Sequence, residues 1–469
     1  MSKKSDVTRR AFMRDAAKVA AGVAAGATVA TQTARADVYK SIMPQTVMGA
    51  NEKIRTGHIG LGSMGTRDLQ IALLRDDIQP IAVCDLVPKF TEQATVIISQ
   101  KYPAPTTHTY FEEIIANKDV DAVVVVTPDH WHTLPSLMAV EAGKDVYCEK
   151  PLCTTLAEAK AIREAVRRTK QVYQSGTMQR SGVYFQEAVQ MIKDGYIGKI
   201  GRVECWNNDH ATVKGIGNPP DSEPPSWLDW ERYIGWTPKV PFNKNRFLYN
   251  FRWFTDYSGG KITDWGAHLL DIALWAMGEE KKIKRVTAAS GNFILEDNRT
   301  TPDTLDAFWE FDDYILSFSN RAWNPDWLEG TAEKSPGHGI FFHGTLGSMR
   351  VDRLGYKVYP FKDNKGCEPV EKRDALEGDM NNGHWENFAQ CVRSRQDPIC
   401  NIDVAYNTVT TCITGKCAYI ANAKLEWDAA TEKFVGKDTD AVALANEWAY
   451  RPYQNGWSLK APYHPNLKA

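Results

Sequence analysis

Short apolar runs and amphipathic stretches alternate along the chain from Ile54 to about Ser175. The apolar runs are near-continuous and rich in β-branched residues, as strands buried on both faces of a parallel sheet are: "IRTGHIGLG", "IQPIAVCDL", "DVDAVVVVTP", "KDVYCEK" and "KQVYQSG". Between them, the spacing of apolar residues predicts helices over residues 64–75, 89–101, 134–142 and 155–169. Strand and helix in alternation predict a doubly wound parallel sheet.

The pattern changes after a helix that we expect in "VYFQEAVQMIKDGYIGKI". The segments that follow read as strands with hairpin-sized gaps: "GRVECWNND", "IKRVTAASGNFIL", "TLDAFWEFDDYILSFSN", "GIFFHGTLGSMRV" and "YKVYPF". They predict a mainly antiparallel sheet, interrupted by the loop "GNPPDSEPPSW", which we interpret as a lid or an interface element. Helical patterns return near the end. We therefore expect an α/β protein with a first domain over residues 50–178, a second over 179–450 and a tail over 451–469.

The first 36 residues have the three parts of an export signal. A basic start precedes an Ala/Gly/Val-rich run over residues 19–30, and "ARA" at 34–36 places small residues before an expected cleavage site. Arg9 and Arg10, followed by Phe12, resemble the twin-arginine (Tat) signal of bacteria. The run is too short and too weakly apolar to be a stable membrane anchor. We expect a Tat-exported periplasmic protein without stable membrane insertion after cleavage.

Charge and length limit the remaining possibilities. Removal of residues 1–36 leaves 49 Lys and Arg against 56 Asp and Glu, a net charge of −7. This balance argues against nucleic acid or an anionic membrane as the partner. The remaining 433 residues are too many for one hydrophobic core, which predicts two or three domains.

The nine cysteines are scattered and form no Cys-x-x-Cys pair. Their odd number and spacing fit neither a disulfide framework nor a zinc site. Unpaired thiols in an exported protein agree with folding in the reducing cytoplasm before export.

The first predicted strand runs into "HIGLGSMGTR", where Gly60, Gly62 and Gly65 form a G-x-G-x-x-G arrangement at the mouth of a helix. In such a turn the first glycine permits a tight turn, the second lets the backbone approach a pyrophosphate, and the third lets helix and strand pack closely. Amides at the helix N-terminus then bind the phosphate charge. The residues between the glycines belong to this predicted dinucleotide site: Leu61, Ser63 and Met64.

Asp85 ends the second predicted strand, twenty residues after Gly65. A carboxylate at that place accepts hydrogen bonds from a ribose 2′-hydroxyl and repels a 2′-phosphate. The sequence therefore favours NAD over NADP as the cofactor.

Two further strand ends point toward the same cleft, since ligands of doubly wound sheets bind at the carboxyl ends of the strands. The residues at these ends, which we expect to contact the cofactor, are Thr127, Pro128, Asp129 and His132 in "VVVVTPDHWH" and Glu149 and Lys150 in "DVYCEKPL". We interpret His130 and His132 as capping or nicotinamide-side residues rather than metal ligands, because the nearby sequence offers no third ligand.

The stretch "TDWGAHLLD" carries Asp264, His268 and Asp271 at i, i+4 and i+7 of a predicted helix. At the 3.6-residue period these side chains share one face. Histidine can exchange a proton near neutral pH, and a carboxylate in the first helical turn stays ionised. We interpret Asp264 and His268 as a pair facing the cleft and Asp271 as a structural partner.

Taken together, "GLGSMG", "TPDHWH", "CEKPL" and "GGKITDWGAHLLDIALW" resemble the Gfo/Idh/MocA oxidoreductases in order and spacing, over nearly the whole chain after the signal. The resemblance implies an N-terminal Rossmann domain and a C-terminal α/β domain whose large open sheet covers the nicotinamide. It also implies catalytic roles for Lys150, Asp264 and His268, and a sugar or glycoside as substrate. A sheet of that kind commonly pairs with a second copy, so we expect a homo-oligomer.

Substrate contacts follow less directly from the sequence. Polar residues in the segments "TMQRS", "WNNDH" and "NFRWFTDY" are the candidates: Arg180, His210, Arg252 and Tyr257. Trp206, Trp253 and Trp265 are rings that could stack on a pyranose.

Three functions compete at this point. The first is an exported oxidoreductase that acts on a CH–OH group of a sugar, glycoside or polyol with tightly bound NAD. The second is a glycosidase that uses transient oxidation at C3, and the third is a non-catalytic sensor of sugar and NAD. The complete set of Lys150, Asp264 and His268 favours the first.

Overall fold

The structure, a computed structural model, describes residues 52–208, 213–324, 337–362, 366–373 and 377–466. The predicted export signal lies outside these ranges. Within them, no helix combines the length and the apolar character that a membrane span requires.

The first sheet has six strands in the order β3-β2-β1-β4-β5-β6, and every neighbouring pair is parallel. The strands are β1 (Ile54–Ile59), β2 (Ile78–Cys84), β3 (Thr106–His108), β4 (Ala122–Val125), β5 (Asp145–Cys148) and β6 (Tyr173–Ser175). This is the doubly wound order of dinucleotide-binding domains. Only the edge strand β3 departs from the sequence expectation, because its three residues are not buried and carry no apolar run.

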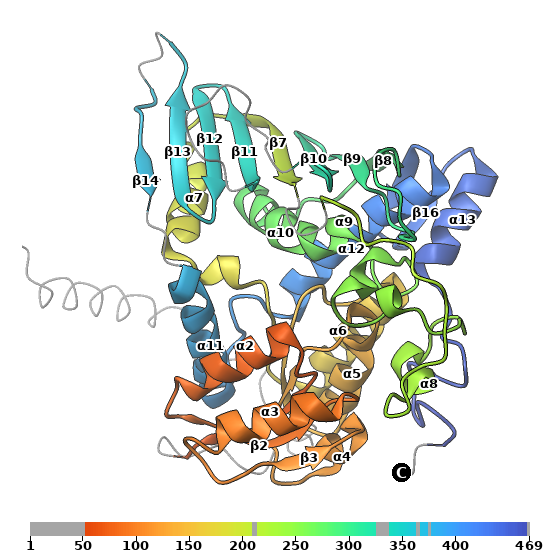
Figure 1. The fold of residues 1–469 in the computed structure, drawn as a ribbon. Coiled ribbons are helices and arrows are strands. Elements are labelled where there is room, and N and C mark those ends of the chain that lie inside the picture. Colours follow the sequence, from red (N-terminus) through yellow and green to blue (C-terminus); the bar gives the residue numbers. More distant parts are fainter. Residues whose placement is uncertain (1–51, 209–212, 325–336, 363–365, 374–376, 467–469) are drawn as a thin grey trace, which may run out of the picture. The chain divides into compact units, whose positions relative to one another are not determined.

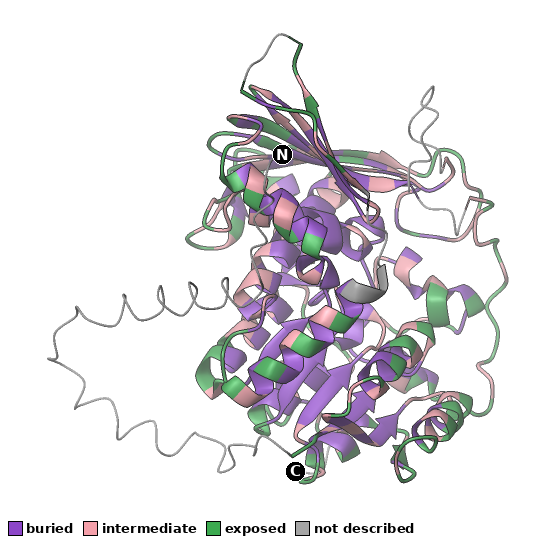
Figure 2. Ribbon diagram, turned by 90° about the vertical axis from the view of Figure 1, so that its left-hand side faces the viewer, coloured by how far each residue is buried: buried purple, intermediate pink, exposed green. Residues whose placement is uncertain are grey.

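Helices surround this sheet, and their outer faces are exposed whereas the strands other than β3 are mostly buried (Figure 2). They are α2 (Ser63–Leu73), α3 (Pro88–Ile98), α4 (Phe111–Ala116), α5 (Thr133–Glu141) and α6 (Leu156–Thr169). The four predicted helices are present within about three residues at each end. Helix α6 begins sharply because Thr155 and Glu158 form a reciprocal capping box.

The second sheet has ten strands in the order β14-β13-β12-β11-β7-β10-β9-β8-β15-β16. Its strands are β7 (Ile200–Asn207), β8 (Arg285–Gly291), β9 (Thr304–Glu310), β10 (Ile315–Arg321), β11 (His338–Gly344), β12 (Gly347–Asp352), β13 (Gly355–Pro360), β14 (Glu371–Arg373), β15 (Leu425–Asp428) and β16 (Lys433–Val435). All neighbouring pairs are antiparallel except β7 with β10. The predicted α/β fold with a mainly antiparallel second sheet is confirmed.

Helices α7, α10 and α12 pack against one face of the second sheet (Figure 1). The helices of this part are α7 (Val183–Lys193), α8 (Trp230–Ile234), α9 (Lys261–Asp264), α10 (Gly266–Met277), α11 (Glu377–Ser394), α12 (Ile402–Ala421) and α13 (Thr439–Ala449). Short 3₁₀ helices are η2 (Asp129–Trp131), η3 (Met178–Ser181), η4 (Lys244–Arg246) and η5 (Leu248–Trp253). Helices α10 and α12 also pack on each other, which places α10 between the two sheets.

Helix α11 packs on the first sheet, although its sequence lies within the predicted second domain. Trp385 of α11 stacks on Tyr147 of β5 at a ring-centroid distance of 4.5 Å, and Phe388 meets the same ring edge-on at 5.7 Å. The chain therefore returns to the first domain after the second sheet.

Candidate functional site

A cavity of about 680 Å³ lies between the carboxyl ends of the first sheet and segments of the second domain. The first sheet contributes the glycine-rich turn and the ends of β2, β4 and β5. The second domain contributes His268, Trp265, Arg353 and a cover segment, which we define as residues 232–252. Of the predicted nucleotide motif, all residues from Gly60 to Gly65 except the buried Leu61 line this cavity, together with Lys150 and His268. Asp264 is not among the lining residues.

The three glycines of the turn have the separate roles that the spacing predicts. Gly60 has φ +85°, and a Cβ there would lie 2.5 Å from the carbonyl oxygen of Val126. A Cβ at Gly65 would lie 2.1 Å from the carbonyl oxygen of Gly60, so helix α2 can approach the turn only without a side chain. At Gly62 a Cβ would meet no atom within 4 Å. The open space at Gly62 faces a cavity and suits the close approach of a pyrophosphate.

Asp85 lies against this turn at the end of β2. Its carboxylate accepts hydrogen bonds from the backbone N–H of Leu61 at 2.7 Å and of Val87 at 2.9 Å. Burial raises the pKa of Asp85 to about 6, although these amides oppose the shift. Each carboxylate oxygen retains a second lone pair, so the group can also accept a ribose hydroxyl.

The strand ends of β4 and β5 are braced by His132. Its Nδ1 lies 2.6 Å from the carbonyl oxygen of Pro151, and its Nε2 lies 2.8 Å from that of Thr127. The hydroxyl of Thr127 is buried and has no hydrogen-bond partner. The open space at Gly62, the carboxylate of Asp85 and this unpartnered hydroxyl together fit a dinucleotide.

Asp129 and His130, which lie shortly before His132, connect the first domain to the second. Asp129 accepts a hydrogen bond of 2.5 Å from the hydroxyl of Ser258. His130 is fully buried and contacts the carbonyl oxygen of Tyr233 at 2.9 Å through Nε2. Asp129 lines the cavity, whereas His130 faces away from it.

Lys150 and Asp264 form a short ion pair between the domains. Nζ of Lys150 lies 2.6 Å from Oδ1 of Asp264, and Arg252 Nε and Lys261 Nζ each lie 3.8 Å from Oδ2. Burial alone would raise the pKa of Asp264, but these three charges outweigh it and hold the pKa well below 3.8. Asp264 is therefore ionised at neutral pH.

His268 lines the cavity beside this pair. Its Nδ1 is buried without a hydrogen-bond partner. Burial, together with the charges of Lys150 and Arg353, lowers the pKa of His268 well below 6.5. The imidazole is therefore neutral at pH 7 and able to accept a proton.

The stretch around Asp264 and His268 differs from the predicted single helix. Helix α9 ends at Asp264, and α10 begins at Gly266 after a turn at Trp265. Asp264 contacts Lys150, and no hydrogen bond joins it to His268. His268 lines the cavity, whereas Asp264 is connected to it through Lys150, so the predicted pairing of Asp264 with His268 is not observed. Local periodicity does not reveal this long-range contact with Lys150.

Glu149 lies beneath Lys150 and is 5 % exposed. A Cβ on Gly176 would lie 2.2 Å from Oε1 of Glu149, so the carboxyl group fills the space that glycine leaves. Burial raises the pKa of Glu149 to about 7, against the influence of the Lys150 charge.

The predicted substrate residues have different environments. Arg252 lines the cavity. Arg180 does not: its Nε bonds Asp271 at 2.7 Å, and its Nη2 bonds Glu279 at 2.5 Å, within a side chain that is 3 % exposed. Arg180 and Asp271 are thus a buried structural pair, which corrects the substrate interpretation of Arg180 and agrees with that of Asp271.

Tyr257 and His210 complete the set of predicted substrate residues. Tyr257 is 0 % exposed and packs against His130 at a ring-centroid distance of 4.9 Å, so its predicted substrate role is not supported. His210 lies outside the described residues. Of the three tryptophans, Trp265 lines the cavity, whereas Trp206 and Trp253 are core residues.

Two sequence profiles of one family match this chain. The profile "Oxidoreductase family, NAD-binding Rossmann fold" matches residues 54–177, and the profile "GFO/IDH/MocA C-terminal domain" matches residues 185–350. Together they cover more than half of the chain. The chain belongs to the GFO/IDH/MocA oxidoreductase family.

Two curated proteins illustrate what this chain is similar to in sequence. The scyllo-inositol 2-dehydrogenase (NAD(+)) of Bacillus subtilis is 25 % identical over 304 residues, which cover 63 % of this chain and 74 % of that enzyme. The alpha-N-acetylgalactosaminidase of Shewanella oneidensis is 26 % identical over 208 residues, 42 % of this chain and 44 % of that protein. The match thus spans less than half of the glycosidase.

The solved structure of levoglucosan dehydrogenase in complex with NADH shares the fold. It has a TM-score of 0.60 and 18 % identity, and the match covers 80 % of this chain and 99 % of that one. The expected NAD-binding oxidoreductase of the GFO/IDH/MocA family is therefore confirmed, with NAD as its cofactor.

The structure also adds residues that the sequence motifs missed. Arg353 follows β12 in a hairpin turn, donates from Nε to Gln179 Oε1 at 3.3 Å and lies over the Trp265 ring at 4.4 Å. Other lining residues come from the cover segment, including Tyr233, Phe247, Leu248 and Tyr249. No local motif identifies these positions, because only the long-range packing brings them to the cavity.

Proposed function

We propose that this protein is an exported NAD-dependent oxidoreductase that acts on a CH–OH group of a sugar, glycoside or polyol and keeps its cofactor bound. The observation that carries the proposal is the position of Lys150, held by Asp264, and of neutral His268 on the cavity that begins at the glycine-rich turn. The similarity to an inositol dehydrogenase supports a polyhydroxylated substrate.

The site residues would have separate roles in cofactor binding, proton transfer and charge stabilisation. The turn at Gly62, Asp85 and Thr127 would hold the cofactor, and bound NAD supplies the acceptor for a hydride. Neutral His268 takes the proton of the substrate hydroxyl as the carbonyl forms. The ammonium group of Lys150 stabilises negative charge on that oxygen, and Asp264 holds Lys150 in place.

Arg252 is the polar group of the second domain that could meet a sugar hydroxyl. It lines the cavity, and its Nε lies 3.8 Å from Oδ2 of Asp264, beside Lys150. A guanidinium group offers several N–H donors to hydroxyl oxygens. We propose Arg252 as a substrate ligand.

The catalytic proposal is tested by screening sugars, glycosides and polyols for reduction of bound NAD, followed with the nicotinamide absorbance. His268→Asn should lower kcat by roughly 10²- to 10⁴-fold, which is the usual contribution of a positioned base. Gln390→Asn, on the exposed side of α11, serves as the matched control and should leave kcat unchanged. Unchanged turnover in His268→Asn would refute the role of His268 and favour a sensor.

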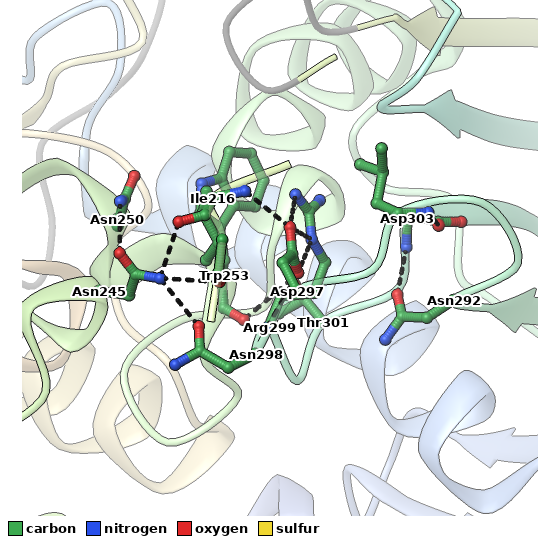
Figure 3. A network of polar contacts seen from close by, with 12 residues as sticks. Ile216, Asn245, Asn250, Trp253, Asn292, Asp297, Asn298, Arg299, Thr301 and Asp303 are labelled. Carbon is green, nitrogen blue, oxygen red and sulfur yellow. Dashed lines mark hydrogen bonds and ion pairs between the residues drawn. The ribbon is translucent and has the colours of Figure 1, made fainter. Parts of the chain in front are cut away.

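Retention of the cofactor is supported by contacts that pin the cover segment. Figure 3 shows Asn245, whose Nδ2 donates to the carbonyl oxygen of Ile216 at 2.9 Å and to Oδ1 of Asn298 at 2.9 Å. At the other end, Arg232 forms an ion pair with Glu112 of the first domain and lies over the Phe111 ring at 4.7 Å. These contacts hold the cover segment at two points along its length, which would slow the release of a ligand from the cavity that it lines.

Retention is tested on protein purified without added nucleotide. Denaturation should release close to one NAD(H) per chain, and Arg232→Ala, which breaks the contact with Glu112, should release less after the same dialysis. Protein that contains no nucleotide after purification from cells would contradict retention.

A glycosidase is the second candidate, and the similarity to the Shewanella alpha-N-acetylgalactosaminidase supports it. Transient oxidation of the sugar eases elimination of the anomeric substituent without net consumption of NAD. Chromogenic glycosides separate the two functions, because hydrolysis releases the aglycone without accumulation of NADH, whereas net oxidation accumulates NADH.

We propose export through the Tat pathway to the periplasm on the basis of the N-terminal sequence alone. Fractionation of cells should find the protein in the periplasm, and replacement of Arg9 and Arg10 by lysine should keep it in the cytoplasm. A cytoplasmic location of the unaltered chain would refute this proposal.

We also propose a homo-oligomer that forms through the second sheet. On the sheet face opposite α10, the ring of Phe341 contacts those of His343 and Tyr359, and Ile315 on the same face is 44 % exposed. Exposed apolar groups on a broad sheet are typical of subunit contacts. Light scattering should give at least twice the monomer mass, and Ile315→Lys should lower it.

A further inference from the structure

Lys416 of α12 is a buried cation that the proposed chemistry does not use. Its side chain is 1 % exposed, and its Nζ donates to the carbonyl oxygens of Ser258 at 3.1 Å and of Thr255 at 3.4 Å. No carboxylate of the described residues lies within ion-pair distance of this ammonium group. The ring of Trp448 lies 5.5 Å from Nζ, which is a weak cation–π contact. A buried charge without a carboxylate partner lowers stability, so stability alone does not explain a lysine at this place.

The two carbonyl groups belong to a turn that we define as the active-site turn, Thr255–Gly259. On one side, the Ser258 hydroxyl bonds the carboxylate of Asp129 in the first domain at 2.5 Å. On the other side, the N–H of Gly259 bonds Oγ1 of Thr263 at 2.9 Å, one residue before Asp264. The turn therefore connects the first domain to the helix that carries the partner of Lys150.

The packing leaves this turn little freedom to move without Lys416. A Cβ on Gly259 would lie 3.2 Å from Cδ of Lys416 and 2.4 Å from the Thr263 side chain. Helices α9 and α12 pack directly on each other. The aliphatic part of Lys416 thus packs against the turn, while its ammonium group binds two carbonyl oxygens of the turn.

We propose that Lys416 is a positioning residue whose ammonium group fixes the active-site turn and thereby places Asp264 and Asp129 for the reaction. This inference rests on the proposed oxidoreductase function for its kinetic readout. The structural part of it, the fixation of the turn, does not.

The surroundings of Lys416 make its charge sensitive to pH. The groups that face it are Arg451 of the tail, Asp256 of the turn, Glu158 of α6 and the neighbouring thiol of Cys417. Burial, reinforced by Arg451, lowers the pKa of Lys416 to about 8. A neutral amine donates weaker hydrogen bonds than an ammonium group, so the turn loosens above this pH.

The pH signature separates positioning from simple stabilisation. Because the pKa of Lys416 is lower in the folded state than the usual 10.5, the unfolded state binds more protons between about pH 8 and pH 10.5, and the share of Lys416 in stability rises over that range. We expect kcat to fall over the same range, because the neutral amine of Lys416 holds the active-site turn less firmly. A lysine with only a structural role would not produce opposite trends.

The test compares the pH profile of kcat in Lys416→Met and Lys416→Arg with that of the wild type. We expect an alkaline limb near pH 8 in the wild type, no such limb in Lys416→Arg, and a roughly tenfold lower, pH-independent kcat in Lys416→Met, the loss of about one charge-assisted hydrogen bond. Methionine removes a buried charge and keeps the volume, so this variant should fold at least as well as the wild type.

Lys144 provides the matched control. It is also a buried lysine whose Nζ donates only to carbonyl oxygens, those of Asn117 at 2.7 Å and Val120 at 2.8 Å, but it lies at the amino end of β5, away from the cavity. Lys144→Met should leave the alkaline limb in place.

Hydrogen exchange of the peptide that contains the active-site turn gives a readout that does not depend on turnover. Faster exchange in Lys416→Met than in Lys144→Met supports the fixation of the turn even if no sugar is oxidised, in which case only the proposed function fails. Unchanged exchange of the turn, or an alkaline limb that persists in both Lys416 variants, would overturn the inference.

Discussion

The ion pair of Lys150 and Asp264 should couple the stability of the two domains. Its atoms are 2.6 Å apart, and the two side chains are only 16 % and 11 % exposed. Removal of one partner from a buried pair costs about 3–5 kcal/mol, so we expect Asp264→Asn to lower the free energy of unfolding by about 3 kcal/mol after allowance for this exposure. The double variant with Lys150→Met should lose less than the sum of the single variants, with a coupling energy of about 2 kcal/mol.

The assay is urea unfolding followed by tryptophan fluorescence for the wild type, both single variants and the double variant. The pKa of Asp264 is lower in the folded than in the unfolded state, so its contribution is complete above about pH 4 and is lost as the pH falls further. The difference between wild type and Asp264→Asn should therefore shrink below pH 4. Single-variant effects that add within about 0.5 kcal/mol, or a difference that grows on acidification, would refute the reasoning.

Three further predictions concern the rest of the site. Gly65→Ala should lower the melting temperature because its Cβ would lie 2.1 Å from a backbone oxygen, whereas Gly62→Val should retain the fold and lose NADH binding, as fluorescence titration would show. Arg180→Leu should lower the free energy of unfolding by about 3–5 kcal/mol, because it leaves the buried Asp271 without its ion-pair partner, and should leave KM unchanged. A rise in KM without a loss of stability would instead support a substrate role for Arg180. The pKa of Glu149 is raised from 4.5 to about 7 in the folded protein, so the protonated group contributes up to about 3 kcal/mol to the free energy of unfolding. This contribution is complete below pH 4.5 and is lost as the pH rises through 7. Glu149→Gln should therefore flatten the dependence of the free energy of unfolding on pH over this range.

Local sequence patterns are sufficient to predict the elements that depend on short-range physics. Gly60, Gly62 and Gly65 reveal their roles through spacing, because a tight turn and a close helix each require a missing side chain at a fixed distance along the chain. Continuous β-branched runs predict the buried parallel strands, and strand-like segments separated by hairpin-sized gaps predict the antiparallel sheet. The prediction of NAD rests on the same stretch of the chain, because Asp85 follows Gly65 by only twenty residues.

Which side chains meet across the two domains depends on long-range packing, which local sequence patterns do not predict. Arg180 and Arg252 look alike in sequence, yet one is buried against Asp271 and the other lines the cavity. Asp264 was assigned to His268 because they are four residues apart, whereas its partner is Lys150, more than a hundred residues away. Lys416 gave no signal at all, since a lysine in an apolar helix identifies no carbonyl partners until the chain is folded. Periodicity fixes which face of an element is apolar, but the choice among distant polar partners depends on how whole elements pack.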